Sequence, residues 1–164
     1  MTDCHGTVID NPMRLNQEQL GLDGHFLDLA LSIKPNGTFT SEVYQKRDSM
    51  PVFKSYRRFP HISSYISEAA KYGVFGSQLH RFATVCSSFT AFKKNTLRLL
   101  GEMLRHGYQY GRLQRTLRNF WSNYQLIQKA VHNQTIRRPQ ALFKLAMKDA
   151  DKLARHIAMA IATP

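Results

Sequence analysis

Hydrophobic residues recur along the N-terminal part of the chain with a period of two. Residues 26–33 (FLDLALSI) place Leu or Ile at every second position, which predicts a half-buried strand. A tight turn over residues 34–37 (KPNG) follows, because Pro presets φ while Asn and Gly tolerate positive φ. Residues 38–45 are rich in Thr, Val, Tyr and Phe and predict the second strand of a β-hairpin. An isolated hairpin is marginal in water, so we expect it to pack on the rest of the chain.

From about residue 65 the apolar spacing changes to three and four residues, which is the period of a helix. Ser88 can cap a helix N-terminus, Gly107 suits the residue just after a helix, and Pro139 suits a first helical turn. Four helices are predicted, at about 75–86, 89–106, 110–127 and 140–161.

These elements predict an α+β fold that is mainly α. One N-terminal β-hairpin precedes a bundle of about four helices, in which the first three form a helix-turn-helix-like trio. The length of 164 residues suits one domain. We divide the chain into four parts. Residues 1–25 are an unassigned loop segment, and residues 26–64 hold the hairpin and a basic irregular segment. Residues 65–135 form a helical domain, and residues 136–164 form a C-terminal helix.

Charge is distributed very unevenly between these parts. The formal net charge is +12, but residues 1–45 carry −4 and residues 46–164 carry +16. Between residues 69 and 148 there are 14 bases and a single acid, Glu102. A helical bundle that paired its own charges would intersperse acids with bases. The excess therefore favours an anionic partner, and it places the contact downstream of residue 45.

Two patterns of basic residues suit a phosphate backbone. In residues 46–64 bases alternate with Phe53, Tyr56 and Phe59, which suits backbone neutralisation with base stacking, although the aromatic rings could equally fill the core. Farther on, arginines recur every three residues from 112 to 118 and form a spiral ribbon about 9 Å long with no acid nearby in sequence. The candidate phosphate contacts are Lys46, Arg47, Lys54, Arg57, Arg58, Arg81, Lys93, Arg98, Arg105, Arg112, Arg115 and Arg118.

Other chemistry finds little support in the sequence. The scattered histidines and Cys4 have no metal-ligand spacing, so no metal or other cofactor is predicted, and Cys86 is expected to be a small buried hydrophobe. No nucleophile motif or phosphate-binding glycine loop occurs. Asp149 and Asp151 should point to different faces of a helix and lie on a solvated surface beside Lys148 and Lys152.

The cysteine content and the first residues of the chain indicate the cellular compartment. Two cysteines make no disulfide framework, and the first residues do not resemble a secretory signal. We therefore expect an intracellular protein, nuclear or cytoplasmic. No stretch approaches 18 apolar residues, so no membrane partner is expected.

A series of short motifs runs in a fixed order over about 100 residues. The motifs are Phe26-Leu27-Asp28-Leu29, Val43-Tyr44-Gln45-Lys46-Arg47-Asp48, Arg58-Phe59-Pro60-His61, Tyr72-Gly73-Val74-Phe75, Ser77-Gln78-Leu79 with Arg81, Cys86-Ser87-Ser88-Phe89, Leu104 with Gly107-Tyr108, and residues 113–120. In this order residues 24–125 resemble the last palm hairpin and the helical thumb of reverse transcriptases from eukaryotic retroelements of the Penelope-like type and their relatives. Ser67 and Gly76 depart from that pattern, which usually has a proline and an apolar residue there.

The resemblance implies a role in gripping nucleic acid. The hairpin would position a primer end, and the helices would follow a template–primer duplex along its backbone, so that the partner is an RNA–DNA hybrid, RNA or DNA. The family's catalytic aspartates lie upstream in a Tyr/Phe-x-Asp-Asp motif, and this sequence contains no Asp-Asp pair. The chain alone is therefore not expected to be an enzyme.

Two alternatives stay open from the sequence. A helix-turn-helix DNA-binding regulator would use residues 89–106 as recognition helix and read bases with Lys93, Lys94, Asn95 and Arg98. An inert or protein-interaction remnant of a retroelement would expose the hairpin's edge and hydrophobic face, which offers a surface for a partner or for self-association.

Overall fold

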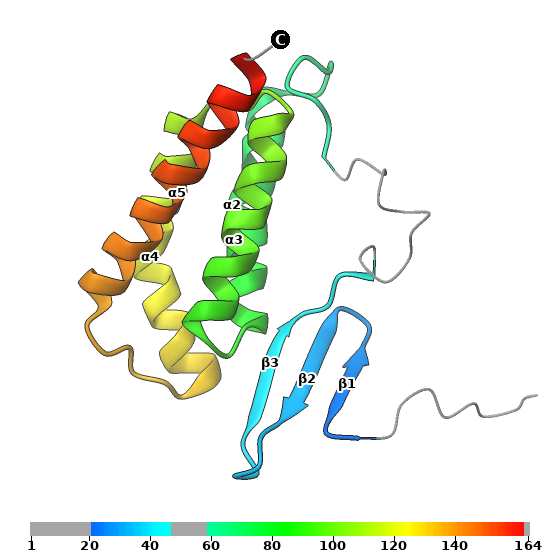
Figure 1. Ribbon diagram of the computed structural model, residues 1–164, viewed down its shortest axis with the longest axis vertical. Coiled ribbons are helices and arrows are strands. Elements are labelled where there is room, and N and C mark those ends of the chain that lie inside the picture. Colours follow the sequence, from blue (N-terminus) through cyan, green and yellow to red (C-terminus); the bar gives the residue numbers. More distant parts are fainter. Residues whose placement is uncertain (1–20, 47–58, 163–164) are drawn as a thin grey trace, which may run out of the picture.

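A three-stranded antiparallel sheet and four helices make up the part of the chain that the computed structural model describes, residues 21–46 and 59–162 (Figure 1). The sheet comes first in sequence and lies beside one end of the helical bundle. This architecture confirms the predicted α+β class with mainly α content.

The strands are β1 (Asp23–Phe26), β2 (Leu29–Ile33) and β3 (Phe39–Val43), in the order β1-β2-β3. The prediction of one strand over residues 26–33 was wrong, because Phe26 pairs with Leu29 and the chain reverses between them. The alternation of leucines continues through this two-residue turn, so it conceals the reversal. The turn over residues 34–37 is confirmed, since the Gly37 N–H donates to the Lys34 carbonyl over 2.8 Å at a φ of 76°.

The turn between β1 and β2 holds Leu27 at a φ of 52°, where a residue with a Cβ is strained by about 1–2 kcal/mol. The Leu27 side chain is exposed, so Leu27→Gly removes this strain without loss of packing. Glycine also makes the unfolded chain more flexible, and this cost offsets part of the relieved strain. We therefore expect the free energy of unfolding to rise by about 0.5–1 kcal/mol in urea titrations. Leu22→Gly is the control: Leu22 is equally exposed but lacks a positive φ, and that variant should be destabilised. A drop in stability for Leu27→Gly would contradict the assigned strain.

The helices are α2 (Glu68–Val85), α3 (Phe89–Arg105), α4 (Tyr110–His132) and α5 (Pro139–Ala162). The Ser88 hydroxyl accepts a hydrogen bond from the Ala91 N–H at 3.2 Å, and Gly107 follows α3 at a φ of 84°, as predicted. The first helix begins earlier than the predicted residue 75, because the Ser67 hydroxyl caps it by accepting from the Ala70 N–H.

The bundle core is built from the predicted apolar stripes. α2 packs against α3 and α4, and α5 packs against the same two helices from the other side. Phe75, Leu79 and Phe82 of α2 are buried, and the Phe92 and Tyr124 rings meet with centroids 4.2 Å apart. These contacts fix the relative placement of the helix surfaces that carry the charge.

The sheet joins the bundle through the edge of β3. The Ser41 N–H donates to the Ser87 hydroxyl at 2.9 Å, and the Ser87 N–H donates back to the Ser41 carbonyl at 3.0 Å. Val43, at the end of β3, is 6% exposed and belongs to the bundle core. The predicted packing of the hairpin on the rest of the chain is therefore confirmed, and the contact is made by the turn between α2 and α3.

Candidate nucleic-acid interface

Acidic residues pair with several of the predicted phosphate contacts, and all but one of these acids lie outside residues 69–148. The pairs are Arg81 with Asp28 at 2.7 Å, Lys93 with Asp149 at 2.8 Å, Arg98 with Glu102 at 3.7 Å, Arg112 with Glu68 at 2.6 Å, and also Lys94 with Glu42 at 3.5 Å. Each exposed pair contributes little stability, but a phosphate must compete with a carboxylate for these bases. The described bases of α2 and α3 are thus mostly occupied.

Arg112 shows how the sequence misled on this point. Its guanidinium hydrogen-bonds the Glu68 carboxylate, 44 residues away on α2, and lies 5.0 Å from the centroid of the Tyr72 ring. The hydrogen bond and the positive charge of Arg112 both lower the pKa of Glu68. The expectation that no acid lies near the arginine ribbon was therefore wrong for its first member. Arg115 and Arg118 are exposed, and among the described residues neither has an ion-pair partner.

The remaining predicted residues are exposed, buried in the core, or outside the described part of the chain. Arg105 is exposed at the end of α3, and Lys46 is exposed just after β3. Phe59 is 7% exposed and part of the core, which favours the core-filling interpretation for that ring. The predicted contacts that lie outside the described residues are Arg47, Lys54, Arg57 and Arg58, together with the aromatic residues Phe53 and Tyr56.

A basic groove of about 460 Å³ runs between α4 and α5. Basic side chains from both helices line it, and Phe143 and Met147 supply its apolar part. Among the described residues these bases have no ion pair, which leaves their charges available. We call this surface the α4–α5 basic groove; it is lined by Arg118, Phe143, Lys144, Met147, Lys148, Asp151 and Arg155.

Asp151 is the one acid that lines this groove, and its carboxylate is engaged from within the protein. Its Oδ1 accepts hydrogen bonds from the Tyr110 hydroxyl at 2.5 Å and from Gln114 Nε2 at 3.0 Å. Burial, with the hydrogen bond to Asp151, raises the pKa of Tyr110, so the hydroxyl stays protonated as donor. Asp151 therefore holds α4 against α5 while four bases surround it.

The prediction for the two aspartates of α5 was half right. They point to different faces, because Asp149 faces Lys93 of α3 while Asp151 faces α4. They are not simply solvated, since both make contacts between helices and both are half-buried. Sequence spacing gives the angle between two side chains of a helix, but it does not give the helix that each one meets.

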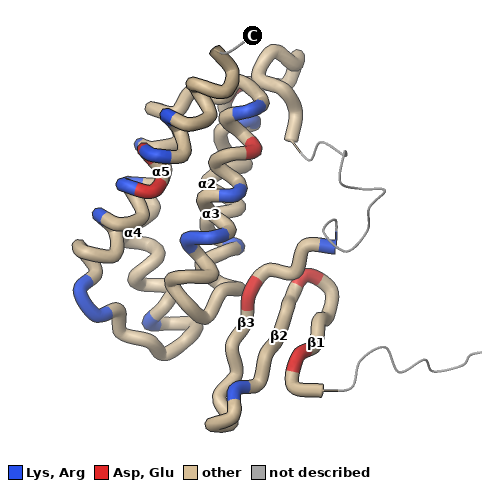
Figure 2. Tube along the Cα trace, in the orientation of Figure 1, with Lys and Arg blue, Asp and Glu red and all other residues tan. Residues whose placement is uncertain are grey.

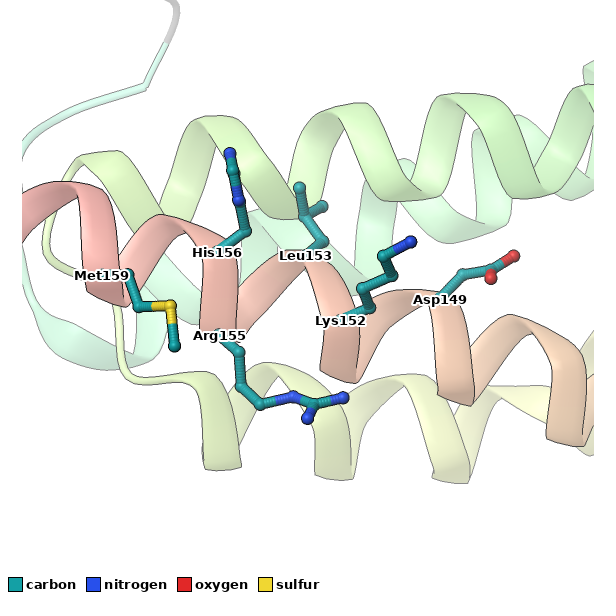
Figure 3. A pocket seen from close by; sticks show the side chains of 6 residues that line it. All are labelled: Asp149, Lys152, Leu153, Arg155, His156 and Met159. Carbon is teal, nitrogen blue, oxygen red and sulfur yellow. The ribbon is translucent and has the colours of Figure 1, made fainter.

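Basic character continues around α5 on its side toward α3. A second hollow of about 600 Å³ is lined there by Asp149, Lys152, Leu153, Arg155, His156 and Met159 (Figure 3). Figure 3 shows Arg155 extending away from His156, toward the opposite side of α5. Arg155 lines both hollows, so the two hollows are neighbours on the surface of α5. Lys152, which lines the second hollow, therefore lies beside the α4–α5 basic groove.

Three groove residues were missed by the sequence reasoning: Lys144, Lys148 and Arg155. The signal was present, because offsets of four and eleven residues place three bases on one side of a helix. From Lys144 to Arg155 the helix rises about 16 Å, which matches about five nucleotide steps of 3.4 Å. The three bases stand at unequal intervals in the sequence, so the stripe emerges only on the helix surface.

The four side chains that a helix-turn-helix regulator was predicted to use on α3 are buried or paired, Arg98 among them through Glu102 at 3.7 Å. Asn95 is 5% exposed and donates to the Ala91 carbonyl at 2.9 Å. Lys93 and Lys94 pair with Asp149 and Glu42. Asn95 Nδ2 also lies 3.7 Å from the Cys86 sulfur. Burial raises the pKa of the Cys86 thiol, and the prediction of a buried Cys86 is confirmed.

Residues 21–46 and 59–162 contain no cluster of three His, Cys, Asp or Glu side chains placed to hold a metal ion. Within the same ranges, every helix is too short or too polar to cross a bilayer.

Comparison with known proteins adds no relative. No family model, no curated protein and no solved structure matches the chain. The functional assignment therefore rests on the residues themselves.

Proposed function

We propose that this chain binds nucleic acid through its phosphate backbone, with the α4–α5 basic groove as the main contact. The role proposed is that of a reverse-transcriptase thumb with the last palm hairpin, which grips a template–primer duplex and does not itself catalyse. The motif order over residues 24–125 supports that role, and the charge distribution supports the class of partner.

The observation that carries the proposal is the convergence of four bases from two helices on one groove. Arg118 of α4 faces Lys144, Lys148 and Arg155 of α5, and the single lining acid already accepts two internal hydrogen bonds. Arg115 is exposed on α4 one turn before Arg118, and Lys152 lines the neighbouring hollow together with Arg155. About six bases can thus meet successive phosphates of one strand.

Binding through such a surface should be independent of base sequence. The groove offers charged groups and an apolar wall, while the amide of Gln114 is bonded to Asp151. Phosphate contacts fix position but carry no sequence information, whereas base edges are read by free amides, guanidinium pairs and methyl contacts.

A salt titration tests the proposal directly. With about six phosphates neutralised, log K for a 20-base-pair RNA–DNA hybrid should fall against log salt with a slope near −5. Fluorescence anisotropy at salt concentrations from 50 to 200 mM measures it, with duplex DNA, duplex RNA and scrambled sequences in parallel. Salt-insensitive affinity, or no binding at 50 mM salt, would refute backbone binding. Strong preference for one DNA sequence in a random selection would favour the helix-turn-helix regulator instead.

A further inference from the structure

The sheet exposes one strongly apolar face. Residues that pair directly across antiparallel strands lie on the same face, and the register pairs Phe26 with Leu29, Leu29 with Val43, and Ile33 with Phe39. We call this surface the apolar sheet face; it carries Phe26, Leu29, Leu31, Ile33, Phe39 and Val43.

The opposite face of the sheet is polar. It carries Asp23, Ser32, Thr40 and Glu42, and the Ser32 hydroxyl hydrogen-bonds the Asp23 carboxylate. The His25 ring on this side stacks on Tyr44 at 4.1 Å. An antiparallel sheet with one polar and one apolar face normally packs the apolar face on a second layer.

The bundle does not supply that layer. It meets the sheet along the β3 edge and, on the apolar sheet face, covers Val43 and the half-buried Ser41, whose hydroxyl donates to the Val85 carbonyl at 2.7 Å. Figure 1 shows β1 as the strand farthest from the helices. Phe26 and Phe39 remain 66% and 70% exposed, and Leu31 and Ile33 are exposed as well.

We propose that the apolar sheet face is a homodimer interface, in which two copies pack these faces against each other as a two-layered sheet. Such packing places the two sheets about 10 Å apart, with strands within about 30° of each other. A face that meets its own copy satisfies the twofold symmetry of most homodimers.

The exposed area fits a dimer of moderate stability. Together with Leu22 at its rim, the face exposes on the order of 600 Å² of apolar residues in each copy. Two copies then bury about 1,200 Å², the lower end of the range for specific interfaces. We expect a reversible dimer with a Kd on the order of 10 µM.

Charge argues against nucleic acid as the occupant of this face. Residues 21–46 carry three acids and two bases, whereas the excess positive charge lies on the helices (Figure 2). β3 contacts α2 and α3, while α5 packs against α3 and α4, so dimerisation leaves the α4–α5 basic groove free. The dimer is therefore independent of the proposed nucleic-acid binding.

Sedimentation equilibrium of the full chain from 1 to 300 µM, without nucleic acid, tests the dimer. The wild type should move from monomer to dimer over this range. Phe26→Asp and Phe39→Asp should each raise the dissociation constant more than tenfold, because an unpaired charge would be buried in the interface. Leu126→Asp is the matched control: Leu126 is 65% exposed on α4 and should leave dimerisation unchanged.

Each other outcome overturns the proposal. A wild type that stays monomeric at 300 µM excludes the dimer without reference to any variant. A dimer that survives both Phe substitutions in variants with native circular dichroism would lie elsewhere on the molecule. Association that occurs only after nucleic acid is added would assign self-association to the basic surface.

Discussion

The triple variant Lys144→Gln, Lys148→Gln and Arg155→Gln will bind an RNA–DNA hybrid about a hundredfold more weakly than the wild type. Each substitution removes one charge from the α4–α5 basic groove, and a lost contact to a solvated phosphate costs on the order of 1 kcal/mol. Binding of the variant should also release three fewer counterions. The slope of log K against log salt should therefore change by about 2.7, from about −5 to about −2. Anisotropy titrations at several salt concentrations measure both quantities.

A second triple variant separates the groove from overall charge. Arg81→Gln, Lys93→Gln and Arg112→Gln remove the same net charge from bases that are already paired with carboxylates. This variant should lose less than tenfold in affinity, because these bases are not free to meet phosphate. If the two triple variants weaken binding equally, the contact is diffuse and the groove is not the site.

Gln128→Leu will lower the free energy of unfolding by about 2–4 kcal/mol. Gln128 of α4 is 1% exposed, and its Nε2 donates to the carbonyls of Ala83 at 2.9 Å and Cys86 at 3.2 Å. These carbonyls lie in the last turn of α2 and at the residue that follows it, where a helix has no internal donors left. Leucine preserves the volume but leaves two buried acceptors unpaired, at about 1–2 kcal/mol for each.

Urea denaturation followed by circular dichroism measures this loss. Gln125→Leu is the matched control, since Gln125 lies one turn earlier on α4 and is only half-buried. It should change the free energy of unfolding by less than about 0.5 kcal/mol. Equal effects of the two substitutions would show that the hydrogen bonds to α2 contribute nothing measurable.

Local signals predicted the elements of this fold well. Ser88, Gly107 and Pro139 mark helix ends through their own backbone and side-chain chemistry, which neighbouring residues suffice to define. The β1–β2 turn was missed because Leu27 stands where the sequence pattern calls for glycine or asparagine. A turn that holds a leucine at positive φ cannot be recognised from its residue types.

Contacts between distant segments could not be predicted from composition. Lys71 is 3% exposed on α2, where its ammonium donates to the carbonyls of Ile62 and Ser64, although lysine is normally a surface residue. Glu68 and Arg112 are likewise brought together only by the packing of α2 on α4. Which bases remain unpaired is therefore a property of the tertiary structure, and this determines the candidate site.

The separation of charge has a consequence for the approach of a partner. Three of the described acids lie on the sheet, while the unpaired bases of the α4–α5 basic groove lie on the opposite side of α2 and α3 (Figure 2). Such an arrangement gives the molecule a permanent electric dipole. In the field of a polyanion this dipole exerts a torque that turns α4 and α5 forward before contact. Encounters would then be pre-oriented, and at low ionic strength the association rate would exceed that of an evenly charged protein with the same net charge.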